Sequence, residues 1–247
     1  MRNVQLGVVC LLGAALLAGC DSYTMATKKL GPASDIVSAS VENLGWQKAF
    51  GGGLGSASFT AVVTTYDKDG RKYTDRQQMV ADLGTGSLAA RVATPGGSWT
   101  VVANVGGLTH LSADAGVDRA VVRERMQLVL PTLLHRLRGP YNLLNGSERG
   151  RGPVATRISG TDVVRIGVTG DNRNAVAYYF DPATGILKFV SAGADAPGGD
   201  GTVTLYEYRS LPNGATFPSV VRVNHIGRNV LLGDSPVFRV EISDVRF

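Results

Sequence analysis

The chain has 247 residues, of which 25 are basic and 20 acidic, and its pI is near 9.4. The basic residues are spread along the sequence and no nucleic-acid-binding motif is present, so we expect no nucleic-acid partner. Both cysteines, Cys10 and Cys20, lie near the N-terminus. The rest of the chain therefore contains no disulfide and no cysteine metal site, and its apolar core must hold it together.

The N-terminus has the layout of a secretory signal peptide. Arg2 supplies one positive charge, and Leu6–Ala18 then runs for 13 residues without a charged side chain. A helix that crosses a bilayer needs about 20 mostly apolar residues, so this run is short for a membrane span. We therefore expect residues 1–19 to be removed.

The tetrapeptide Leu17-Ala18-Gly19-Cys20 ends the apolar run and resembles the lipobox of bacterial lipoproteins. The resemblance implies cleavage between Gly19 and Cys20 and transfer of a diacylglycerol to the Cys20 thiol. The alternative is an ordinary secretory cleavage beside an incidental cysteine. With residues 1–19 removed, 228 residues remain (247 − 19), carrying 24 basic side chains (25 − 1) and 20 acidic ones.

The segment after the cleavage site is small and polar. Residues 20–33 include Lys28, Lys29 and Pro32 but no apolar set that could form a core, so we expect a lipidated tether. Residues 34–247 are expected to form one domain.

A helix is predicted over residues 36–50, at the start of this domain. Ser34 and Asp35 are candidate caps for its N-terminus, and Gly51–Gly53 is a strong stop signal. Its apolar residues recur near the helical period: Ile36, Val37, Val41, Leu44 and Ala49.

After the glycines the hydrophobic pattern alternates with a period of two, and turn signals such as Asp69-Gly70 and Pro95-Gly96-Gly97 recur about every ten residues. This pattern is typical of an antiparallel sheet built from hairpins. The predicted strands are 57–66, 71–82, 87–93, 99–105, 108–111, 154–159, 163–169, 175–180, 187–191, 203–208, 219–225 and 237–245.

A second amphipathic helix is predicted over Val117–Arg138, between the two sets of strands. Pro131 has no N–H for the carbonyl of Gln127, so we expect the helix to kink or break near Leu130. Such a break is either a packing kink or the joint of a movable lid.

This order of elements resembles that of the outer-membrane lipoprotein carrier and receptor family (LolA/LolB-like), over about Ile36–Phe247. Local stretches that support the resemblance are Leu44–Gly52, Tyr179–Gly185, Glu207–Arg209 and Phe217-Pro218. It implies a mainly β (α+β) fold: a single strongly curved antiparallel sheet that forms an unclosed barrel. An N-terminal helix and the broken central helix would cover its open face.

A curved sheet with an apolar concave face leaves room for an apolar ligand unless helices fill it. The resemblance implies a lipid or the acyl chain of a lipoprotein. The residues that we expect to line the cavity are Phe59, Val63, Trp99, Met126, Leu130, Leu134, Tyr178 and Phe180, with Ala61 and Val176 beside them. Residues of these types are also the usual constituents of a plain core, and periodicity does not separate the two interpretations.

The hairpin Pro95–Trp99 is comparable to a protruding loop that carries an exposed apolar residue in the receptor member of the family. Here the tip is glycine, with Trp99 to one side.

No catalytic constellation is visible in the sequence. His110, His135 and His225 lie far apart and lack metal-ligand spacing, and no serine lies in a nucleophile elbow. We therefore predict a protein that is not an enzyme and that needs no metal or cofactor. The alternatives are a tethered scaffold with a filled barrel that binds a protein partner and, with less support, an envelope hydrolase. The expected location is the cell envelope, with the domain facing the periplasm. Asp21, directly after Cys20, resembles an inner-membrane retention signal of some bacterial lipoproteins, and both membranes stay open as the site of the anchor.

Replacing Cys20 should abolish lipid anchoring. We expect Cys20→Ser to give a soluble or unprocessed species, because the lipobox is the one candidate anchor in the sequence. Membrane fractionation and the mass of the processed protein measure this, with Cys10→Ser as the matched control. A Cys20→Ser protein that matures with lipid attached and sediments like the wild type would contradict the assignment.

Overall fold

The computed structural model describes residues 31–52, 54–67, 69–144, 150–158, 160–168, 176–193, 201–227 and 230–247. Cys20 and the predicted cleavage site lie outside the described residues, so their roles remain predictions. The strands are β1 Ser56–Tyr66, β2 Lys72–Asp82, β3 Ser87–Thr94, β4 Gly97–Asn104, β5 Gly107–Ala113, β6 Gly150–Ile158, β7 Thr161–Val168, β8 Val176–Phe180, β9 Leu187–Ala192, β10 Thr202–Ser210, β11 Thr216–Gly227 and β12 Val230–Arg246.

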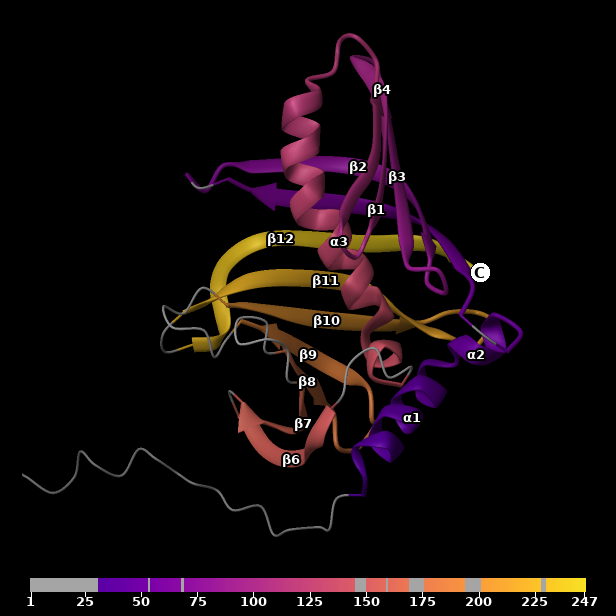
Figure 1. Cartoon of the computed structure of the whole chain (residues 1–247), viewed down its shortest axis with the longest axis vertical. Helices are drawn as coiled ribbons and strands as arrows, with labels where there is room; N and C mark the ends of the chain where they lie inside the picture. The colour runs from indigo at the N-terminus through magenta and orange to yellow at the C-terminus, as the bar shows by residue number, and fades with distance from the viewer. Residues whose placement is uncertain are drawn as a thin grey trace, which may run out of the picture.

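These strands form one open antiparallel sheet in the order β5-β4-β3-β2-β1-β12-β11-β10-β9-β8-β7-β6. Two meanders, β1 to β5 and β6 to β12, are joined where β1 pairs with β12, with Val63 opposite Val240. The edge strands are β5 and β6, and the sheet curves around the central helix (Figure 1). The predicted fold class and all of the predicted strands are confirmed, with ends shifted by at most four residues except in β12, which begins seven residues before the predicted start.

The alternation in the sequence places one face of each strand in the core. In β1, Ala57, Phe59, Ala61 and Val63 are at most 2% exposed. Turn chemistry supports the register, since Gly70 in the β1–β2 turn has a φ of 77°, which costs glycine little. The carboxylate of Asp67 accepts bonds from the backbone N–H groups of Asp69 and Arg71 in the same turn, at 2.9 and 2.8 Å.

The predicted N-terminal helix is present, but the prediction that it runs unbroken over residues 36–50 is wrong. The structure has α1, Ala33–Leu44, and α2, Trp46–Ala49, separated by Gly45 in a left-handed conformation with φ 67°. A Cβ at Gly45 would lie 3.3 Å from backbone atoms of Gly214 and Ala215, so a side chain there would be crowded as well as strained by the positive φ. The predicted caps Ser34 and Asp35 lie inside α1, which begins after Pro32 without a side-chain cap.

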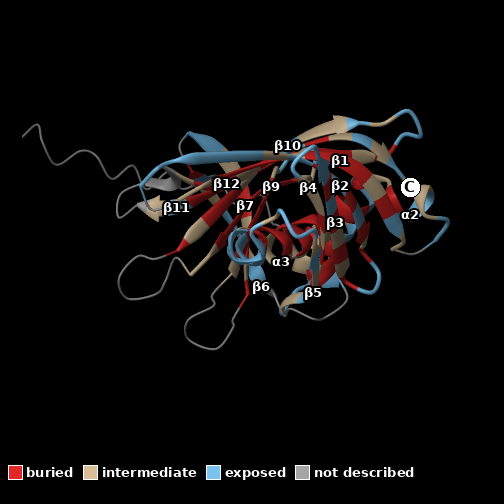
Figure 2. Ribbon diagram, turned by 90° about the horizontal axis from the view of Figure 1, so that it is seen from above, coloured by how far each residue is buried: buried red, intermediate tan, exposed pale blue. Residues whose placement is uncertain are grey.

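The central helix α3 spans Arg119–Leu144. The carboxylate of Asp118 caps its N-terminus by accepting bonds from the N–H groups of Ala120 and Val121, at 2.9 and 3.2 Å. The helix lies along the concave face of the sheet, and α1 packs beside it (Figure 1). Buried residues of strands and helix gather between them, while outer surfaces are mostly exposed or intermediate (Figure 2).

The predicted break near Leu130 and Pro131 is also wrong. The backbone leaves helical geometry at Gly139, with φ 31° and ψ −112°. Gly139 precedes Pro140, and a residue before proline is disfavoured in the α region. At Pro131 the carbonyl left without an N–H belongs to Gln127, which is exposed, so water can hydrate it.

Side chains replace the helical bonds that the break at Gly139 removes. The carbonyl of His135 accepts a bond from Asn142 Nδ2 at 3.2 Å, and that of Arg136 accepts one from the Tyr206 hydroxyl at 3.2 Å. In a continuous helix these carbonyls would bond the N–H groups of residues 139 and 140, and Pro140 has none. The two carbonyls that lose their helical partners at the break are therefore bonded by side chains of α3 and β10.

The hydrogen bond from the Tyr206 hydroxyl to the Arg136 carbonyl should contribute measurably to the stability of the domain. We expect Tyr206→Phe to lower the free energy of unfolding by about 1–3 kcal/mol, because it leaves the buried carbonyl of Arg136 without a donor. Urea unfolding measures the change. The control is Tyr73→Phe, whose half-exposed hydroxyl donates to Asp67 at 3.3 Å and whose loss should cost about 0.5 kcal/mol or less. Equal effects of the two substitutions would contradict this account of the break.

Candidate functional site

The eight side chains predicted to line a cavity all lie in one apolar cluster between α3 and the concave face of the sheet. Phe59 and Val63 come from β1, Trp99 from β4, Met126, Leu130 and Leu134 from α3, and Tyr178 and Phe180 from β8. Ala61 joins the same cluster and Val176 packs against it. The fold therefore brings together residues from four elements that are far apart in the sequence.

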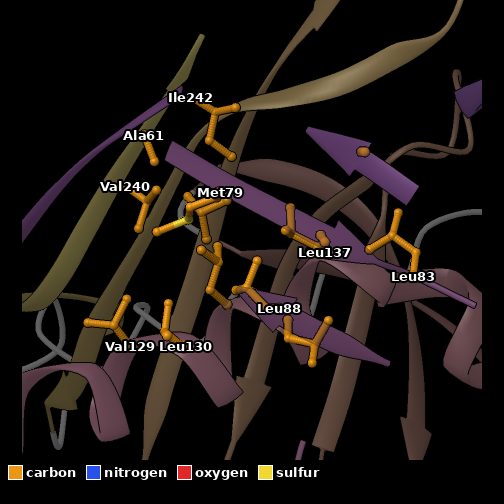
Figure 3. Packing of buried hydrophobic residues seen from close by; sticks show 14 of the residues in the cluster. Ala61, Met79, Leu83, Leu88, Val129, Leu130, Leu137, Val240 and Ile242 are labelled. Atoms are coloured by element: carbon orange, nitrogen blue, oxygen red, sulfur yellow. The ribbon is translucent and has the colours of Figure 1, made fainter. Parts of the chain in front are cut away.

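This space is filled in the structure. Val63, Leu130, Leu134, Tyr178 and Phe180 are 0% exposed, so none of them borders a void that admits a water molecule. Figure 3 shows Val129, Leu130 and Leu137 of α3 among residues of the sheet such as Met79 and Val240. A ligand that used this wall would have to displace α3 or part of it.

Trp99 points into the interior. It is 7% exposed and lies in the ladder between Val92 of β3 and Ala113 of β5. It is not available to contact a membrane in this conformation.

Arg125, which was not among the predicted site residues, connects the N-terminal half of α3 to the sheet. Its Nη2 lies 2.6 Å from the carboxylate of Asp75, its Nε donates to Thr65 at 3.0 Å, and its guanidinium lies 5.4 Å from the centre of the Tyr73 ring. We call these four residues the Arg125 latch. The signal in the sequence was weak: polar side chains at inward-facing positions of β2, in step with Met79 and Ala81.

Gln77 continues this polar row into the core. It is 0% exposed, its Nε2 donates to the sulfur of Met126 at 3.6 Å, and its Oε1 has no hydrogen-bond partner. A thioether is a weak acceptor, so α3 gains little from this contact.

Arg136 is a second residue that pattern reasoning missed. It follows Leu133 by three positions and therefore lies on the buried stripe of α3, where it is 6% exposed. Its Nη1 lies 3.2 Å from His135 Nδ1, and its Nε is buried without a partner. An arginine is rarely so buried without a carboxylate beside it.

The three histidines lie on separate elements, His110 on β5, His135 on α3 and His225 on β11. Within the described part of the chain, no three metal-ligating side chains gather, and no helix is both long enough and apolar enough to cross a bilayer.

Comparison with known proteins identifies the fold. No family model and no curated protein matches the sequence. Among solved structures, a LolA superfamily protein from Nitrosomonas europaea superposes with a TM-score of 0.58 at 12% identity, over 88% of this chain and 94% of that one. A DUF1329 family protein from Desulfovibrio piger superposes with a TM-score of 0.51 at 10% identity, again over 88% and 94%. The chain therefore has a LolA-like fold, and at these identities the similarity extends to the fold alone.

A charge placed on the inner face of α3 should be costly. We expect Leu134→Glu to destabilise the domain by about 3–5 kcal/mol, because the carboxylate would be buried without a partner. The matched control is Leu128→Glu on the same helix, where the side chain is 43% exposed and the change should stay within about 0.5 kcal/mol. Urea unfolding of both variants measures the difference. A Leu134→Glu domain as stable as the control would mean that water reaches this face of the helix.

Proposed function

We propose that this protein is an envelope lipoprotein, anchored through acylated Cys20, whose half-barrel domain binds the acyl chain of a lipid or of a lipoprotein. The observation that carries the proposal is a continuous apolar wall on a concave sheet that one helix closes. The LolA-like fold is consistent with such a role.

An apolar ligand could replace the contacts that α3 makes with the wall. The helix gives the wall chiefly apolar contacts, and an acyl chain supplies contacts of the same kind, at about 0.8 kcal/mol for each buried CH₂ group. The polar attachment of its N-terminal half is the Arg125 latch, whose Arg125 and Asp75 side chains are 19% and 25% exposed. Ion pairs this accessible to water contribute about 1 kcal/mol or less, so releasing the latch costs little.

A tethered scaffold is the second candidate, and one observation favours it: five of the eight wall residues have no exposed surface, which is the property of a filled barrel. A hydrolase has less support. Hydrolysis needs polar groups of perturbed acidity that converge in a cleft. The carboxyl pKa values of Asp67, Asp82 and Asp114 are lowered, but chiefly because each accepts a bond from a backbone N–H group, in its own turn for Asp67 and Asp82 and from Ser98 of β4 for Asp114.

Binding of an uncharged fluorescent probe tests the proposal. The described fold lies within residues 31–247, so a chain that starts at Asp21 keeps all described contacts and avoids the lipid anchor. We expect it to bind N-phenyl-1-naphthylamine saturably. Arg125→Ala should raise the affinity about fivefold, because removing about 1 kcal/mol from the closed state raises the competent fraction.

The matched control is Arg123→Ala, which removes an exposed arginine from the same turn of α3 and should leave the affinity unchanged. If neither the wild type nor Arg125→Ala binds the probe, the half-barrel is a filled scaffold and the proposed function is wrong.

A further inference from the structure

The guanidinium of Arg136 is the most unusual charge in the interior. It lies on the buried stripe of α3 and is 6% exposed, and the backbone carbonyl of the same residue accepts a bond from the Tyr206 hydroxyl of β10 at 3.2 Å. The site is thus a buried cation on the side of α3 that faces the sheet.

Nothing in the described part of the chain neutralises this charge. The ion pairs there involve Lys188 and arginines other than Arg136. Its neighbour His135, whose Nδ1 lies 3.2 Å from Nη1, supplies no negative charge. Burial raises the pKa of Tyr206 and Tyr208 well above the ordinary value, so neither phenol serves as a counter-anion at neutral pH.

A buried cation without an anion is costly, and replacing such a group by an apolar side chain often stabilises a protein. The Nε–H of Arg136 is likewise buried without an acceptor. Both deficits would be met by one oxyanion, because a guanidinium presents two parallel N–H groups to carboxylate or phosphate.

The fold also keeps Arg136 in place if the N-terminal half of α3 moves. The Arg136 carbonyl is held by the Tyr206 hydroxyl and the His135 carbonyl by Asn142, next to the break at Gly139. The N-terminal half is held by apolar contacts and by the partly exposed Arg125 latch instead. Space opened by release of the latch would therefore have Arg136 at its inner end.

We propose that Arg136 is the anchor for the oxyanion head of an amphipathic acyl ligand, a carboxylate or a phosphate, whose chain occupies the apolar wall. This inference rests on the proposed function and deepens it: the cargo is an acidic lipid and not the uncharged acyl groups of a lipoprotein.

Competition at neutral pH tests the assignment. The chain from Asp21 is loaded with N-phenyl-1-naphthylamine, and the probe is displaced with dodecanoate, dodecyl phosphate or dodecanol below their micellar concentrations. We expect one or both anions to compete about 10- to 100-fold better than dodecanol, the range that a charge-assisted hydrogen bond supplies. The better anion tells a fatty-acid head from a phosphate head.

In Arg136→Met this preference should fall to about one, with dodecanol binding retained. Arg136→Lys keeps the charge and should keep part of the preference. The matched control is Arg138→Met, two residues along α3, where the side chain lies beside the β2–β3 turn near Gly86. It should behave like the wild type. Ligand-free Arg136→Met should melt at or above the wild-type temperature, and Arg136→Gln replaces it if it does not fold.

The outcomes separate the two proposals. Equal competition by all three ligands on the wild type, or a preference that survives in Arg136→Met, would overturn the oxyanion site while leaving acyl binding intact. Failure of the wild type to bind the probe or any ligand would overturn the proposed function and the site with it.

Discussion

The connection from β5 to β6 constrains the whole molecule. These strands are opposite edges of one sheet, so the chain between them must cross its full width. It does so mainly as α3, whose continuous part before Gly139, residues 119–138, corresponds to about 30 Å of helix. Because the sheet is curved, the crossing runs through the concave side, and the inner stripe of the helix completes the core. The residue types of that stripe therefore decide whether α3 fills the barrel permanently or can be replaced there by a ligand.

The strands could be predicted because their signals are local: alternation within a strand and glycine at a turn do not depend on the rest of the fold. The breaks in the helices could not. Pro131 and Pro140 look alike in the sequence, but the carbonyl freed by the first faces water, while the one freed by the second is bonded by a residue 70 positions away. The two-helix N-terminus likewise depends on the approach of Gly214 and Ala215 to Gly45.

The candidate site divides in the same way. The residues of the apolar wall could be predicted from periodicity, and all eight lie in one apolar cluster. The roles of Arg125 and Arg136 could not be predicted from periodicity, because each role depends on which residues lie opposite the arginine in the folded chain. The side chain of Arg125 pairs with a carboxylate on β2, 50 positions away, whereas that of Arg136 lies beside His135 with no carboxylate among the described residues near it. The same residue type thus closes one half of α3 and leaves an unmatched charge in the other.

The positions of the two tryptophans make the two ends of α3 optically distinguishable. Trp46 is buried against Tyr141 and Phe217, with ring centres 5.7 and 5.3 Å away, and its indole N–H donates to the carbonyl of Thr216. Trp99 lies at the other end, in the ladder beside the residues that lead into the helix. Since the sequence contains no other tryptophan, each single-tryptophan form of the protein carries a native emission signal from one end. Separate movement of the two halves of α3 would then appear as a change in one spectrum without the other.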